Sequence, residues 1–128
     1  MRYLLDTHTL LWFIAEDKKL SARARRLILD SSSEVLLSIA SLWEIAVKVN
    51  IGKLDLDKPF NQLFPDELDF HGIDMLDITI DHFMQVTTLP LYHRDPFDRL
   101  IIAQALVEGL PIIGVDSAFD AYGVSREW

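Results

Sequence analysis

The chain has 128 residues, half of them hydrophobic, and a formal net charge of −8 from 20 acidic and 12 basic residues. This length and hydrophobic content suit one domain, residues 1–128, with a single core. The absence of cysteine excludes disulfides, thiol catalysis and cysteine zinc sites. The acidic balance argues against broad electrostatic attraction to nucleic acid, so any such contact needs a local basic patch or a metal site.

The first third of the chain alternates apolar runs with helical patterns. Residues 2–5 predict a short buried strand, and residues 7–17 continue with helical character. Asp6 interrupts the apolar opening, so we expect no signal peptide, no membrane span and a cytoplasmic protein. Ser21 is a plausible N-cap for a second helix, and residues 34–38 predict another compact strand.

The middle of the chain predicts one strong helix and then less regular structure. Residues 38–54 have a helical pattern that Gly52 is expected to end. Residues 55–72 predict a connection with one short helix that begins near Pro59. Residues 73–78 alternate weakly and predict a strand.

The last third contains the clearest helix signal. Residues 79–90 predict a helix that a proline terminates. Asp95 as N-cap and Pro96 as first helical residue predict a further helix that runs to Gly109. Residues 110–116 then predict a buried strand. A short helix or turn follows, with Val124 in a final edge strand.

Strands that alternate with helices predict an α/β fold, a three-layer α/β/α sandwich around a mostly parallel central sheet. The strands are continuous apolar runs, which is typical of a sheet covered on both faces.

Four acidic residues stand out by their positions in these elements. Asp6 and Asp116 lie at the carboxyl ends of two predicted strands, where ligands bind in open parallel sheets. Asp98 lies in the first turn of an apolar helix, on the face that carries isoleucines. Glu44 lies in a helix that is apolar nearly all round. Burial of unpaired charges at such positions is costly.

Each acid also has a purely structural explanation. Asp6 and Asp116 are placed to cap helices, the helix dipole favours Asp98, and Glu44 has Lys48 four residues later.

If the four carboxylates converge, however, they repel one another and raise one another's pKa values. A divalent cation resolves this repulsion, and an all-oxygen site selects Mg²⁺ or Mn²⁺. Such a site suits phosphodiester hydrolysis by a metal-activated water.

Four blocks of the sequence carry a resemblance to a known family. They are "LLDTHTLLW", "SIASLWEIAVKVNIGKL", "HRDPFDRLIIAQA" and "GVDSAFDAYGV". In order and spacing the chain resembles PIN-domain nucleases, in particular the VapC-type toxins of toxin–antitoxin pairs. The resemblance implies an α/β/α fold, a homodimer, Mg²⁺- or Mn²⁺-dependent endoribonuclease activity on RNA, and a cognate antitoxin that occludes the site.

The resemblance also implies roles for individual residues. The family's acidic set falls on Asp6, Glu44, Asp98 and Asp116, and Asp6 and Asp98 are the candidates for direct metal ligands. Thr7 and Ser117 are candidates for hydrogen-bond support of the carboxylates. One departure is Gly114, which stands where many relatives have a threonine or serine. Loss of that hydroxyl would weaken the support of Asp116.

Neighbouring residues have ordinary structural interpretations. Asp95 is better explained as an N-cap than as a metal ligand. An internal ion pair is the default for Arg94 and Arg99, and structural hydrogen bonding is the default for His8 and His93.

Two other classes of protein remain as alternatives. An aspartate-based phosphotransfer domain commonly has a second aspartate two residues after its nucleophile, and His8 occupies that position after Asp6. A non-catalytic α/β binding module would use the acids only as helix caps, and its four carboxylates would point to different places.

Overall fold

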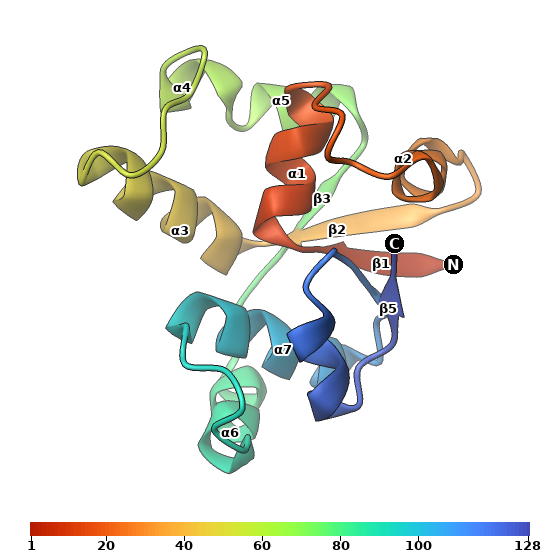
Figure 1. The fold of residues 1–128 in the computed structure, drawn as a ribbon, viewed down its shortest axis with the longest axis vertical. Coiled ribbons are helices and arrows are strands. Elements are labelled where there is room, and N and C mark those ends of the chain that lie inside the picture. The colour runs from red at the N-terminus through yellow and green to blue at the C-terminus, as the bar shows by residue number, and fades with distance from the viewer.

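The computed structural model describes residues 1–128, and its centre is a five-stranded sheet with the order β3-β2-β1-β4-β5 (Figure 1). Every neighbouring pair of strands is parallel, which confirms the predicted mostly parallel sheet. The strands are β1 (Arg2–Leu5), β2 (Glu34–Ser38), β3 (Asp74–Leu76), β4 (Ile112–Ile113) and β5 (Arg126–Glu127).

Helices cover both faces of this sheet, so the fold is the predicted three-layer sandwich. Figure 1 shows α1, α4 and α5 on one side of the strands and α6 and α7 on the other. None of the helices is long and apolar enough to cross a bilayer. The helices are α1 (Thr7–Ile14), α2 (Ala22–Leu29), α3 (Ile39–Asn50), α4 (Phe60–Leu63), α5 (Asp66–Phe70), α6 (Ile80–Thr88), α7 (Pro96–Glu108) and the 3₁₀ helix η1 (Ser117–Tyr122).

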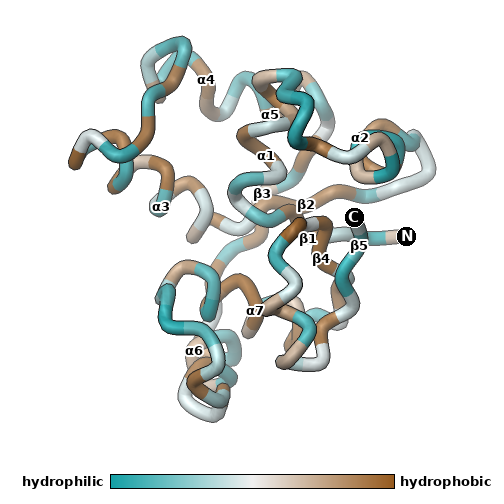
Figure 2. Tube along the Cα trace, in the orientation of Figure 1, coloured by the Kyte–Doolittle hydropathy of each residue, from teal (hydrophilic) through white to brown (hydrophobic).

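Two hydrophobic cores lie on the two faces of the sheet. Successive residues of a strand point to opposite faces, so Tyr3 and Leu5 join one core while Leu4 joins the other. The first core contains buried residues of α1, α2 and α3, and the second contains Ile101 and Ile102 of α7. Figure 2 shows hydrophobic residues along the strands in the middle of the molecule.

The caps of two helices are confirmed atom by atom. The Ser21 hydroxyl accepts a hydrogen bond from the Ala24 N–H at the start of α2. At the start of α7, Oδ1 of Asp95 accepts from the next two N–H groups after Pro96. Gly109 ends α7 with a left-handed φ of 66°, a conformation that glycine adopts without a Cβ penalty.

The predicted stop of α3 at Gly52 is confirmed, because the helix ends at Asn50 and Gly52 follows Ile51 with a left-handed φ of 76°. Other predicted boundaries were wrong. Strand β4 has only two residues, Ile112–Ile113, and is shorter than the predicted strand over residues 110–116. The final edge strand is β5, whereas Val124 precedes it and packs against the second core. Helix α5 was not predicted as a separate helix.

The strand order places a topological switch point at β1. From β1 the chain builds β2 and β3 on one side, and it then crosses over to place β4 on the other side. Ligand sites in open parallel sheets lie beyond the carboxyl ends of the strands at such a point. Asp6 directly follows β1 and Asp116 follows β4, so both acids belong to this edge.

Candidate functional site

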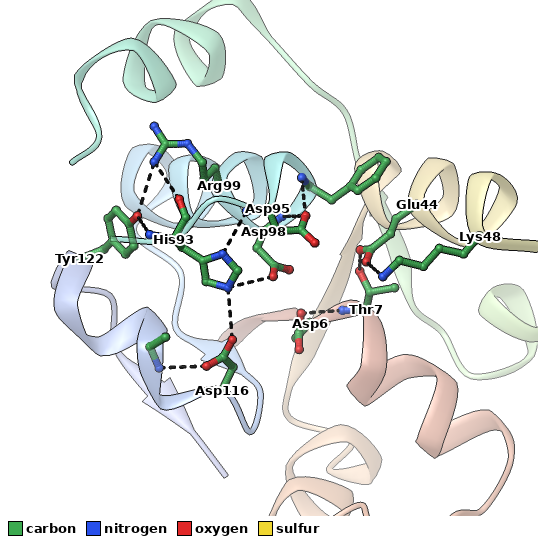
Figure 3. Close-up of polar contacts among 12 residues, drawn as sticks. Asp6, Thr7, Glu44, Lys48, His93, Asp95, Asp98, Arg99, Asp116 and Tyr122 are labelled. Carbon is green, nitrogen blue, oxygen red and sulfur yellow. Dashed lines mark hydrogen bonds and ion pairs between the residues drawn. The ribbon is translucent and has the colours of Figure 1, made fainter. Parts of the chain in front are cut away.

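Three of the four predicted acids face a common space beyond the sheet edge (Figure 3). Asp6 and Asp116 cap the elements that follow them, because Oδ1 of each accepts a 2.9 Å hydrogen bond from the N–H of Thr7 and Ala118, respectively. The predicted capping contacts are therefore present, yet each cap uses only one carboxylate oxygen. Asp98 projects from the first turn of α7 toward the same space.

Glu44 lies on the other side of Asp6 and has both carboxylate oxygens engaged (Figure 3). The Thr7 hydroxyl donates to Oε1 at 2.7 Å, and the Lys48 ammonium donates to Oε2 at 2.5 Å. The side chain is only 2% exposed. The ion pair with Lys48 offsets the charge that burial would otherwise penalise, and the predicted hydrogen-bond support by Thr7 is given to this acid.

The electrostatics of the site single out Asp6 and Asp98. Burial raises the pKa of Asp6 to about 6, and the charges of Glu44 and Asp116 add to the rise, against the opposing effects of His8 and the Thr7 N–H. Burial likewise raises the pKa of Asp98 to about 8, with further contributions from the negative charges of Asp6, Asp95, Glu44 and Asp116. Like charges that must share a buried site disfavour ionisation in this way.

His93, for which the sequence favoured structural hydrogen bonding, is a member of the cluster. Its Nε2 lies 3.1 Å from Oδ2 of Asp98 and makes a 3.3 Å hydrogen bond with Oδ2 of Asp116. The three side chains each bring one nitrogen or oxygen atom to this place, and these atoms all lie within 4.8 Å of one another. One local feature of the sequence indicates this placement of His93, which lies two residues before the N-cap Asp95. Nδ1 of His93 accepts a hydrogen bond from the Asp95 N–H.

Arg99 supports this cluster through contacts with backbone carbonyl groups and does not pair with an acid. Its guanidinium donates to the carbonyl oxygens of Leu89, Pro90 and His93. It therefore fixes the loop that carries His93, and the expectation of an internal ion pair with an acid was wrong.

Two further expectations concern the surroundings of Asp116. Ser117 is exposed, and no hydrogen bond joins its hydroxyl to an acidic side chain. Gly114 faces Asp6 instead of Asp116: a Cβ built at this glycine would lie 3.0 Å from the Asp6 Cβ and 3.6 Å from its Oδ2. The missing side chain thus makes room for Asp6.

The donor set fits a hard divalent cation. Asp6 and Asp98 offer carboxylate oxygens whose ionisation is disfavoured until positive charge is supplied, and Lys48 is already paired with Glu44. Carboxylate oxygens are the ligands of Mg²⁺ and Mn²⁺. The convergence of Asp6, Asp98 and Asp116 also disfavours the non-catalytic alternative, which expected the carboxylates to point apart.

Comparisons with solved structures give the same fold. The chain superposes on VapBC2 from Rickettsia felis bound to a promoter DNA fragment with a TM-score of 0.73 and 15% identity, covering 99% of this chain and 98% of that one. For FitAB bound to the IR36 DNA fragment the TM-score is 0.68 and the identity 20%, over 99% and 94% of the two chains. VapBC-1 from nontypeable Haemophilus influenzae gives 0.65 and 15%, over 99% and 97%.

The sequence comparisons differ in what they find. A search of curated proteins gives no match. The model of the PIN domain, in contrast, matches residues 3–124, which contain β2, β3, β4, all of β1 except Arg2, and all four predicted acids. The chain therefore belongs to the PIN-domain family.

Proposed function

We propose that the protein is a Mg²⁺- or Mn²⁺-dependent endoribonuclease that acts as the toxin of a VapC-type toxin–antitoxin pair in the cytoplasm. The observation that carries this proposal is that Asp6 and Asp98 face a common space at the switch point of the sheet (Figure 3), with the pKa of both carboxyls raised. Membership of the PIN-domain family supports nuclease activity at such a site.

Each acid has a separate task in the proposed mechanism. Asp6 and Asp98 hold the cation, while Asp116 and the Thr7–Glu44–Lys48 group complete the pocket. A divalent ion held there would supply an activated water and would neutralise charge on the phosphate. No side chain needs to attack the phosphate in this mechanism, and the chain has no cysteine that could do so.

A local basic wall provides a path for the RNA despite the acidic net charge. Next to Glu44 lies a cavity of about 220 Å³, lined in part by His8, Lys48 and Lys53. Lys48 is neutralised by Glu44, whereas no acid contacts Lys53 within ion-pair distance. Lys53 is therefore the cation that remains to receive a backbone phosphate.

The solved structures on which this chain superposes support an antitoxin partner, because they are VapBC and FitAB assemblies. A homodimer is supported by exposed apolar side chains on α6: Ile80, Phe83 and Met84 are each more than half exposed. Exposed apolar groups of this size mark association surfaces. A Phe83→Asp variant should elute as a monomer in light-scattering chromatography, and Phe70→Asp, on the distant exposed α5, should not change the mass.

The function is tested by RNA cleavage with purified protein. Cleavage should stop in EDTA and return on addition of Mg²⁺ or Mn²⁺, and Asp98→Asn should abolish it. Asp57→Asn, at an exposed acid outside the cluster, is the matched control and should retain activity. Cleavage that persists in chelator, or in the Asp98 variant, would refute the proposal. Expression of the wild-type chain alone should also slow cell growth.

A further inference from the structure

The cluster contains one group that is not an acid, and it lies between two carboxylates. Nε2 of His93 is 3.1 Å from Oδ2 of Asp98 and 3.3 Å from Oδ2 of Asp116. Figure 3 shows the imidazole of His93 in contact with one oxygen of each of these two carboxyl groups. A histidine nitrogen in this position either donates a hydrogen bond, or is bare and can bind a metal or accept a proton donor, and these two states are different tautomers.

The other ring nitrogen decides between these roles. Nδ1 of His93 accepts a 3.2 Å hydrogen bond from the Asp95 N–H. A nitrogen that accepts carries no proton, so the proton of the neutral ring is on Nε2. A protonated Nε2 donates to carboxylates and has no lone pair for a cation.

The ring is also held from the backbone side. The His93 N–H donates to the Tyr122 hydroxyl at 2.7 Å, and its carbonyl oxygen accepts from Arg99 at 3.2 Å. The imidazole packs edge-on against the buried Phe119, with ring centroids 5.8 Å apart. A ring flip that presents a bare nitrogen to the acids would break the Nδ1 hydrogen bond and disturb this packing.

From these contacts we propose that His93 is a positioning residue that occupies the place of a second cation. Its Nε2–H holds Asp116 beside Asp98, and the site would therefore bind one divalent ion, which Asp6 and Asp98 would hold. This inference rests on the proposed metal-dependent function. A second ion between the Oδ2 atoms of Asp98 and Asp116 would need ligands at about 2.1 Å, in the space that the Nε2–H now fills.

The tautomer is tested first, in the metal-free protein. Long-range ¹H–¹⁵N NMR spectra should show His93 with a protonated Nε2 and a bare Nδ1. A proton on Nδ1 of the neutral ring would overturn the proposal.

The number of ions bound per chain is tested by titration with Mn²⁺, monitored by calorimetry and by electron paramagnetic resonance. The wild type should bind one ion per chain, and pulsed spectra should show no coupling to a ligating nitrogen. His93→Gln keeps an N–H donor and should also bind one ion. His93→Ala removes the donor, so it should bind a second ion and should bind the first about tenfold more weakly, since outer contacts of this kind change metal affinity by about 10- to 100-fold.

The possible failures are distinguishable. Two ions in the wild type, a nitrogen coupling, or a His93→Ala variant identical to the wild type would overturn the role of His93 while leaving a metal-dependent nuclease intact. No Mn²⁺ binding together with no RNA cleavage would overturn the proposed function itself. Thermal unfolding in EDTA checks that both variants are folded.

Discussion

Replacement of Asp98 by asparagine should stabilise the metal-free protein while it abolishes activity. The folded-state pKa of this carboxyl is raised from 3.8 to about 8, chiefly by burial. Between about pH 4 and pH 8 the folded protein therefore holds a proton that the unfolded chain releases, and the free energy of unfolding falls as pH rises. Asp6, with a pKa of about 6, adds to this fall between about pH 4 and pH 6.

The magnitude follows from the shift. At pH 7 this shift lowers the free energy of unfolding by about 4 kcal/mol, compared with a carboxyl whose pKa is unchanged by folding. The Asp98 side chain is 18% exposed, and access of water to it reduces the expected gain of Asp98→Asn to about 2 kcal/mol. Asparagine matches the shape of aspartate and removes only its charge, so it leaves the packing of α7 against the sheet in place.

Urea denaturation in EDTA at pH 5 and pH 8 measures this effect. The wild type should be less stable at pH 8 than at pH 5, and Asp98→Asn should remove most of the difference. Asp57→Asn is the control, and it should keep the wild-type pH dependence. Saturating Mn²⁺ should stabilise the wild type at pH 8, by about 2.7 kcal/mol at 100 times the Kd, and should not stabilise the variant. Equal stability of Asp98→Asn and the wild type across this pH range would refute the reasoning.

Two further substitutions probe the shape of the site and its basic wall. Gly114→Ala places a Cβ 3.0 Å from the Asp6 Cβ; Asp6 must shift, and calorimetry should show Mn²⁺ binding weakened about tenfold. Unchanged affinity would mean that Asp6 does not hold the ion. Lys53→Glu should raise the KM for RNA with little change in kcat, and the KM should become less sensitive to salt. Lys58→Glu, at an exposed lysine that does not line the cavity, is the control; an equal effect there would refute the assigned path.

The placement of the acids could be predicted because it depends on local rules. Parallel strands end at the same edge of a sheet, so the two aspartates that follow apolar strands, Asp6 and Asp116, were expected there. The Asp95–Pro96 pair fixes the start of α7 and hence the position of Asp98 in its first turn. The two interpretations of Glu44 were not exclusive, because one oxygen pairs with Lys48 and the other accepts from Thr7.

The surroundings of the acids could not be predicted because they depend on long-range contacts. His93 lies in a loop without periodicity, and its backbone is held by Tyr122, 29 residues away, and by Arg99. The role of Gly114 requires the approach of β4 to β1, which the sequence does not display. The Ser117 hydroxyl was predicted to support an acid, but it makes no such hydrogen bond, since the side chain is exposed at the start of η1.

The central claim is that Asp6 and Asp98, distant in the chain, form one cation site. Crystals soaked in Mn²⁺ test it directly through anomalous diffraction at the manganese edge. We predict a single peak within ligand distance of the carboxylate oxygens of Asp6 and Asp98. The absence of any peak there at saturating Mn²⁺, with the fold intact, would contradict the claim.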